Sequence, residues 1–347
     1  MSFTTTSHVP DGLLPHGGQL RAAVTQFSIP LPQWLDLSTG INPNGWPTKM
    51  PPETVWSRLP EDDDELESIA CRYYGVHRIL PVAGSQAAIQ ALPRLRAPSR
   101  VGVLHPGFSE HSNAWQSQHH EVTAITADQI DNTLSSINVL VLTQPNNPTG
   151  ATFDTDRLVH WHEQLAARGG WLIVDEAYMD ATPERNIAAY ADSPGLIVLR
   201  SLGKFFGLAG ARVGFVCAEA RLLAQLRQLL GPWAISHPSR WIASQALQDA
   251  EWQHHARQQL LASSNRLQTL LIQNQLHPTG SCAFFHWIVS PHAAAIHRSL
   301  AEQGILVRRF DDPPSIRLGL PASEDDWLHL ESTLAHIAAI HSGTRSC

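Results

Sequence analysis

The sequence predicts an α/β protein in which helices cover both faces of a mostly parallel sheet. One observation is a set of short, almost continuously apolar segments, which are typical of strands buried on both faces of a sheet. These segments span 101–104, 138–143, 171–174 and 196–199. A second observation is that segments with the apolar spacing of a helix alternate with them, as in a parallel sheet with crossover helices.

Length and composition bound the number of domains and the classes of partner. A chain of 347 residues with 43% hydrophobic content can bury the cores of two domains. We expect an N-terminal arm at 1–45 that joins the small domain, a large domain at 46–235 and a small C-terminal domain at 236–347. The formal charge of −7 gives no basic surface, so we expect no nucleic-acid partner.

The cysteines and the apolar segments favour a cytoplasmic protein. Its four cysteines lie far apart without a Cys-x-x-Cys motif, which is typical of reduced thiols. The apolar segments are shorter than the ~20 residues of a membrane helix, and the N-terminus lacks the basic start and apolar stretch of a signal peptide. The histidine pairs at 119–120 and 254–255 have no carboxylate at ligand spacing, so we expect no metal.

The N-terminal arm contains turns with open backbone amides. His16-Gly17-Gly18 follows a proline, and the stretch 34–45 contains Gly40, Ile41 and an Asn-Pro step. Exposed N–H groups of this kind can bind an anion. A flexible tail is the alternative interpretation.

The next elements are a helix and a strand-turn-helix unit. Apolar residues spaced from Leu66 to Tyr73 predict a helix that ends at Gly75. An apolar segment then leads to Gly84-Ser85-Gln86 and to a helix that begins at Ser85. The first N–H groups of that helix can bind a phosphate, although many strand-to-helix turns contain Gly-Ser.

Four side chains come shortly after the four apolar strands. They are Phe108, Asn147, Asp175 and Lys204. In parallel sheets ligands bind beyond the carboxyl ends of the strands, so we expect these side chains to converge on one site. Taken singly, Phe108 could be a core residue and Asn147 part of an ordinary turn.

Helices and a small domain complete the prediction. We expect helices at 156–168, where Gly169-Gly170 follows, and at 218–230. In the last third, strands at 284–289, 304–310 and 315–320, two of them with arginines, favour a small α+β domain.

Lys204 lies in the glycine-rich stretch 201–214. A lysine amine condenses with an aldehyde to a Schiff base, and small neighbours allow a flat ring to approach the backbone. Ser201 and Arg212 can hold a phosphate, the arginine through a charge-assisted fork. A surface lysine in a glycine-rich loop is the alternative.

Three motifs identify a family that the chain resembles over nearly its whole length. They are Asn147-Pro148-Thr149-Gly150, Asp175-Glu176-Ala177-Tyr178, and Ser201-x-x-Lys204 through Arg212. Their order and spacing are similar to those of fold-type I enzymes dependent on pyridoxal 5′-phosphate, the class I/II aminotransferase superfamily. The resemblance implies a large domain with a mostly parallel seven-stranded sheet, a small α+β domain and a homodimer.

The resemblance also implies roles for the motif residues. Lys204 would bind the cofactor covalently, Asp175 would pair with its protonated ring nitrogen, and Tyr178 and Asn147 would hydrogen-bond its ring oxygen. Phe108 would stack on the ring. The phosphate would be held by Gly84, Ser85, Gln86, Ser201 and Arg212. Two residues depart from the family pattern: Gly203 replaces a common Ser or Thr, and Leu59 replaces a common tyrosine.

Within the superfamily, shorter stretches resemble the branch of histidinol-phosphate aminotransferase and threonine-phosphate decarboxylase. These stretches are His16-Gly17-Gly18, 37–43 and Pro106-Gly107-Phe108. The resemblance implies decarboxylation of L-threonine O-3-phosphate to (R)-1-amino-2-propanol O-2-phosphate, for cobalamin biosynthesis. The alternative is an aminotransferase that acts on histidinol phosphate or a related compound.

The substrate hypothesis assigns anions to arginines. Arg317 would hold the carboxylate, while Arg308 and the arm at 16–18 would hold the phosphate and tilt the carboxylate out of the ring plane. Gly40, Ile41 and Asn147 would also contact the substrate. An exposed basic edge is the alternative for Arg308.

Overall fold

The computed structural model describes residues 16–343. Residues 1–15, which include the expected start of the arm, and Cys347 lie outside the described residues. The chain forms two compact units, one from 41–262 and one that combines 16–40 with 263–343.

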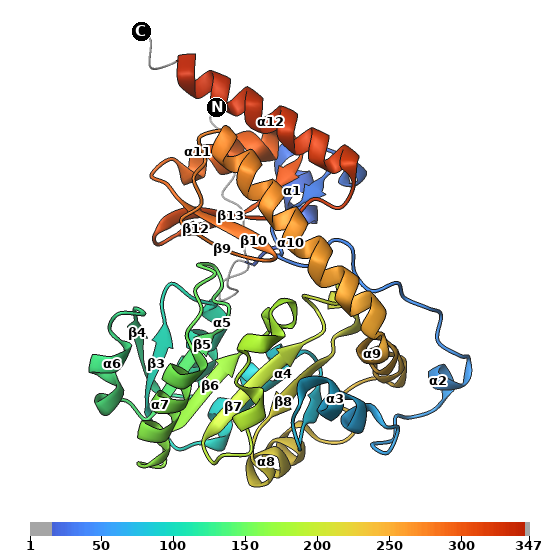
Figure 1. Ribbon diagram of the computed structural model, residues 1–347, viewed down its shortest axis with the longest axis vertical. Helices are drawn as coiled ribbons and strands as arrows, with labels where there is room; N and C mark the ends of the chain where they lie inside the picture. The colour runs from blue at the N-terminus through green and yellow to red at the C-terminus, as the bar shows by residue number, and fades with distance from the viewer. Residues whose placement is uncertain (1–15, 344–347) are drawn as a thin grey trace. The chain divides into compact units, whose positions relative to one another are not determined.

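The larger unit is built on a seven-stranded sheet in the order β2-β8-β7-β6-β5-β3-β4 (Figure 1). Its strands are β2 Leu80–Val82, β3 Arg100–Leu104, β4 Glu121–Ile125, β5 Val139–Thr143, β6 Trp171–Asp175, β7 Leu196–Ser201 and β8 Gly214–Cys217. Strand β8 is antiparallel to both of its neighbours, and all other adjacent strands are parallel. The predicted mostly parallel seven-stranded sheet is therefore confirmed.

The apolar strands form because helices cover them. A core of buried side chains joins one face of the sheet to α4, α5 and α8, and Val141, Ile173 and Ile197 belong to it. Alternate residues of the same strands, such as Leu140 and Leu172, are also buried. Burial on both faces explains why these strands have no polar alternation.

Four helices of this unit agree closely with the sequence prediction. They are α3 Leu66–Tyr74, α4 Ser85–Ala91, α7 Thr155–Ala166 and α8 Ala220–Leu230. The unit also contains α2 Thr54–Ser57, α5 Ser109–Ser117, α6 Ile130–Thr133, α9 His237–Gln248 and the first part of α10 Ala250–Gln273. Short 3-10 helices are Leu92–Leu95, Leu134–Ser136, Met179–Ala181, Pro183–Arg185, Ala188–Tyr190 and Ala209–Ala211. Helix α3 ends at Gly75, which adopts a left-handed φ of 67°.

The larger unit extends further along the chain than the boundary expected at 235. Helix α9 packs against α2 and α3 and buries Ala243, Ala246 and Leu247. Helix α9 therefore belongs to this unit, because these apolar residues find their partners on helices that come much earlier in the sequence, and the unit ends at Ala262 within α10.

The smaller unit contains a four-stranded antiparallel sheet in the order β12-β13-β10-β9 and a parallel pair of β1 and β11. Its strands are β1 Leu35–Asp36, β9 Gly280–Cys282, β10 Phe285–Val289, β11 Ile305–Leu306, β12 Arg308–Asp311 and β13 Pro314–Gly319. Its helices are α1 Leu20–Phe27, the 3-10 helix Leu31–Gln33, the last part of α10, α11 Ala293–Glu302 and α12 Glu324–Gly343. The single strand predicted at 304–310 is two strands, since β11 pairs with β1 and β12 pairs with β13. Within 16–343, none of the helices has the length and apolar character required to cross a bilayer.

Candidate active site

A pocket of about 210 Å³ lies at the carboxyl ends of the parallel strands in the larger unit. Its lining residues are Ser85, Gln86, Phe108, Thr143, Asn147, Asp175, Ala177, Tyr178, Ser201, Gly203, Lys204, Ala209 and Arg212. The structure thus brings together all the residues predicted to contact a cofactor except Gly84, which directly precedes Ser85. This convergence follows from the topology, because parallel strands end at the same edge of the sheet.

One corner of the pocket is suited to an anion. Gly84 has a φ of 72°, and a Cβ atom there would lie 2.5 Å from Nη2 of Arg212. The missing side chain at Gly84 therefore leaves room for the guanidinium next to the backbone. Arg212 itself donates from Nη1 to the carbonyl oxygen of Ala209 at 3.1 Å, which helps to fix its side chain.

The departure at Gly203 has a local explanation. Its N–H donates to Oγ of Ser201 at 3.2 Å, and a Cβ atom at Gly203 would lie 3.3 Å from the same oxygen. A serine or threonine at 203 would therefore crowd the Ser201 hydroxyl in this chain.

The pocket also contains a carboxylate in a fixed position. Asp175 is 3% exposed. Nε2 of His111 lies 3.0 Å from Asp175 Oδ2, and the N–H of Ala177 donates to Asp175 Oδ1 at 3.1 Å. An ionised carboxylate only accepts hydrogen bonds, so His111 donates from Nε2 to it.

Sequence reasoning missed His111 and Thr143. His111 is three residues after Phe108 in the first turn of α5, a spacing that places two residues near each other on a helix. Thr143 ends β5 and is in register with Asp175 on β6. Both residues could have been found by asking which side chains neighbour the strand ends.

Lys204 and Tyr178 lie close together in the pocket, and Asn146 joins the turns at Phe108 and Asn147. Nζ of Lys204 lies 5.3 Å from the centroid of the Tyr178 ring. The buried Asn146 donates from Nδ2 to the carbonyl oxygen of Pro106 and to Oγ1 of Thr149, both at 2.8 Å. Asn146 thus ties the turn before Phe108 to the turn that contains Asn147.

The predicted substrate residues lie mostly in the smaller unit. Arg317 is 4% exposed and donates from Nη2 to the carbonyl oxygen of Ser38 at 2.6 Å. The N–H of Gly18 donates to Oγ of Ser38 at 2.7 Å, and a Cβ atom at Gly17 would lie 2.5 Å from the Ser38 carbonyl oxygen. The arm and Arg317 therefore meet at Ser38, and His16 is exposed at the start of the described chain.

Arg308 and Arg317 are cross-strand partners on β12 and β13. Burial, together with the charge of Arg317, lowers the pKa of Arg308 to about 10. Two neighbouring guanidinium groups in a partly desolvated place favour an anion. Gly40, with a φ of 60°, is the last residue of this unit's first segment, and Ile41 begins the larger unit.

A lysine amine, a buried carboxylate and a cationic corner lie together at the end of a mostly parallel sheet. This combination is typical of α/β enzymes that bind a flat phosphorylated cofactor. The chain belongs to the aminotransferase class I and II family, whose model matches residues 34–329. The predicted family and fold are thereby confirmed.

Curated relatives agree with this family, and solved structures agree with the fold. The chain is 52% identical to the threonine-phosphate decarboxylase of Pseudomonas aeruginosa, over 93% of this chain and 97% of that protein. It is 37% identical to the threonine-phosphate decarboxylase of a Sinorhizobium species, over 93% and 98% of the two chains. The histidinol-phosphate aminotransferase of Sinorhizobium meliloti, solved in complex with pyridoxal-5′-phosphate, matches with a TM-score of 0.79 at 19% identity over 97% of this chain and 98% of that one. The L-threonine-O-3-phosphate decarboxylase of Porphyromonas gingivalis matches with a TM-score of 0.72 at 18% identity, over 87% and 98% of the chains.

Proposed function

We propose that this chain is a pyridoxal 5′-phosphate-dependent decarboxylase that converts L-threonine O-3-phosphate to (R)-1-amino-2-propanol O-2-phosphate and CO₂. The observation that carries the proposal is the 52% identity to a threonine-phosphate decarboxylase over nearly the full length of both chains. The chain is 33% identical to the histidinol-phosphate aminotransferase of Haemophilus influenzae, and over only 52% of this chain.

The pocket residues fit this cofactor. Arg212, the Ser201 hydroxyl and the backbone of 84–86 offer cationic and N–H or O–H groups to a phosphate. Phe108 offers a flat apolar face to a ring, and Lys204 offers an amine to an aldehyde. When bound, pyridoxal 5′-phosphate supplies that aldehyde and a pyridinium ring that withdraws electrons from the substrate Cα.

The side chains of this protein control protons at defined atoms. Asp175, fixed by His111 and by the N–H of Ala177, would pair with the ring nitrogen and keep a proton on it. Tyr178 and Asn147 would hydrogen-bond the ring oxygen. Lys204 would be the group that returns a proton to the substrate Cα after CO₂ departs.

The smaller unit supplies the substrate anchors. Arg317 binds the substrate carboxylate, and Arg308 with the arm at 16–18 binds the substrate phosphate. Gly40, Ile41 and Asn147 complete the contacts. Anchoring both anions of one substrate determines which Cα bond is oriented for cleavage.

A carbon dioxide assay tests this function. The purified holoenzyme is expected to release CO₂ from L-threonine O-3-phosphate with no keto acid present. L-Threonine, which lacks the phosphate, should be a poorer substrate by at least about 100-fold in kcat/KM. Turnover of histidinol phosphate that depends on 2-oxoglutarate, without CO₂ release from the threonine phosphate, would instead identify an aminotransferase.

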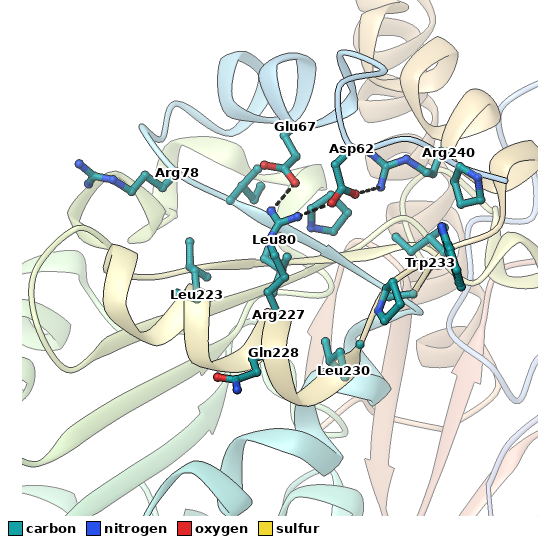
Figure 2. A pocket seen from close by; sticks show the side chains of 18 of the residues that line it. Asp62, Glu67, Arg78, Leu80, Leu223, Arg227, Gln228, Leu230, Trp233 and Arg240 are labelled. Atoms are coloured by element: carbon teal, nitrogen blue, oxygen red, sulfur yellow. Dashed lines mark hydrogen bonds and ion pairs between the residues drawn. The ribbon is translucent and has the colours of Figure 1, made fainter.

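We also propose that the enzyme is a homodimer. Large apolar side chains are exposed at Trp56 (63%), Leu59 (62%) and Trp233 (60%). Trp233 lines a second pocket of the larger unit (Figure 2). Pro60, the neighbour of Leu59, lines this pocket too. A group of exposed apolar side chains on one unit is typical of a surface that another protein covers, and the partner proposed here is a second copy of the chain.

Substitution of Trp233 tests the dimer. Sedimentation of the wild-type enzyme should give the mass of two chains, and Trp233→Glu should raise the dimer dissociation constant by at least about tenfold. Leu328→Glu is the control, since Leu328 is also 60% exposed but lies on α12. A fully active wild-type monomer at assay concentrations would contradict the proposal.

Two broader assignments complete the proposal. The scattered cysteines favour a reducing compartment, so we place the enzyme in the cytoplasm. The product is an amino alcohol phosphate, and the relatedness to threonine-phosphate decarboxylases supports its use in cobalamin biosynthesis.

A further inference from the structure

The segment 175–180 has one set of side chains in the pocket and another in a buried ionic cluster. Asp175, Ala177 and Tyr178 line the pocket. The carboxylates of Glu176 and Asp180 instead bind Arg200: Nη1 of Arg200 lies 2.5 Å from Glu176 Oε2, and Nη2 lies 2.5 Å from Asp180 Oδ1. Arg200 thus holds this segment on both sides of Tyr178.

Arg200 also belongs to the strand that leads to Lys204. It is the residue before Ser201 at the end of β7. The N–H of Glu176 donates to the carbonyl oxygen of Leu199 at 2.9 Å. The ion pairs and this hydrogen bond therefore join the end of β6 to the end of β7, where the pocket residues begin.

Arg257 on α10 makes a second connection between the same two segments. Its Nε donates to the carbonyl oxygen of Asp180 at 2.9 Å, and its Nη2 lies 3.3 Å from the Tyr73 hydroxyl. Its guanidinium carbon lies 5.2 Å from the ring centroid of Phe205, the residue after Lys204. Arg257 therefore contacts the segment that bears Tyr178 and the segment that bears Lys204.

Stability alone is a weak explanation for this cluster. Two carboxylates and two guanidinium groups balance in charge, but burying them costs solvation energy that apolar side chains would not lose. A buried ionic cluster can instead hold the segments that carry its side chains in one arrangement. The segments that this cluster joins carry Tyr178 and Lys204, and Nζ of Lys204 lies 5.3 Å from the centroid of the Tyr178 ring.

We propose that Arg200 and Arg257 are positioning residues that hold Tyr178 in place relative to Lys204 in the holoenzyme. Neither arginine lines the pocket, so each acts through the segments it contacts. The effect on turnover rests on the decarboxylase activity proposed above, whereas the effect on the bound cofactor does not.

A double-mutant cycle between Arg257 and Tyr178 tests the proposal. Arg257→Met keeps the length of the side chain and removes its donors. It is expected to lower kcat for CO₂ release by about 10-fold to 100-fold, because a small misplacement of reacting groups has an effect of this size. KM should change by less than about twofold. In a Tyr178→Phe background, Arg257→Met should lower kcat by less than about threefold, because its effect on kcat passes through Tyr178.

Visible circular dichroism of the lysine-bound cofactor gives a readout that does not depend on substrate. The band should change in Arg257→Met and stay unchanged in the control Arg266→Met, which lies on the same helix but pairs with the exposed Glu324. Two results would overturn the proposal. One is a wild-type kcat in Arg257→Met. The other is an equal loss of kcat with Tyr178 and with Phe at position 178, together with an unchanged circular dichroism band.

A second variant keeps the test valid if Arg257→Met does not fold. Tyr73→Phe removes only a hydroxyl, which lies 3.4 Å from Asp180 Oδ1 and 3.3 Å from Arg257 Nη2, and leaves no buried charge without its ion pair. It should lower kcat by about threefold, and by less in the Tyr178→Phe background.

If the wild-type holoenzyme releases no CO₂, the proposed function fails, and the circular dichroism comparison still decides the role of Arg257.

Discussion

Replacement of Lys204 by alanine is expected to abolish covalent attachment of pyridoxal 5′-phosphate and to lower kcat by at least about 10⁵-fold, as for loss of a central catalytic group. The amine of Lys204 is the group in the pocket that can condense with the cofactor aldehyde. It is also the group proposed to return a proton to the substrate Cα. Its removal therefore eliminates two roles at once.

The composition of the chain makes this prediction unusually direct to measure. The sequence contains two lysines, Lys49 and Lys204. Borohydride reduction of the holoenzyme, followed by digestion and mass spectrometry, should label the peptide that contains Lys204. Lys49→Ala is the matched control, because Lys49 is exposed, and should keep both the label and the activity. A labelled cofactor adduct in Lys204→Ala protein would refute the assignment.

The strands and the convergence of the pocket residues could be predicted from sequence because they depend on local patterns. Burial on both faces makes strands such as Val139–Thr143 continuously apolar, and parallel strands place the residues that follow them at one edge. Asp175, Asn147 and Lys204 were therefore expected together before any contact was known.

Other features depend on contacts between distant parts of the sequence and leave no local pattern. His111 reaches Asp175 across 64 residues of sequence, and Arg257 reaches Asp180 across 77. The edge strand β4, Glu121–Ile125, is mostly exposed or half-buried, so it lacks the apolar signature of the central strands. Helix α9 belongs to the larger unit because it packs against α2 and α3, which come much earlier in the sequence.

Replacement of Asp175 by asparagine is expected to lower kcat by about 10³-fold while the cofactor stays attached to Lys204, a loss of the size found when one fixed electrostatic group is removed. Asparagine has nearly the same shape, and its oxygen and amide can still bond to the Ala177 N–H and to His111, since the imidazole can change its tautomer. What the substitution removes is the negative charge. Without that charge the pKa of the ring nitrogen falls, and the ring withdraws electrons less strongly from the substrate Cα.

The measurement compares attachment and turnover in the same protein. Borohydride labelling of Lys204 should be unchanged in Asp175→Asn, and single-turnover CO₂ release should be slow. Asp192→Asn, which removes a carboxylate from the surface pair with Arg78, controls for the general loss of a negative charge. A kcat within about tenfold of the wild-type value in Asp175→Asn would contradict the role of Asp175, because hydrogen bonding by the neutral side chain would then suffice.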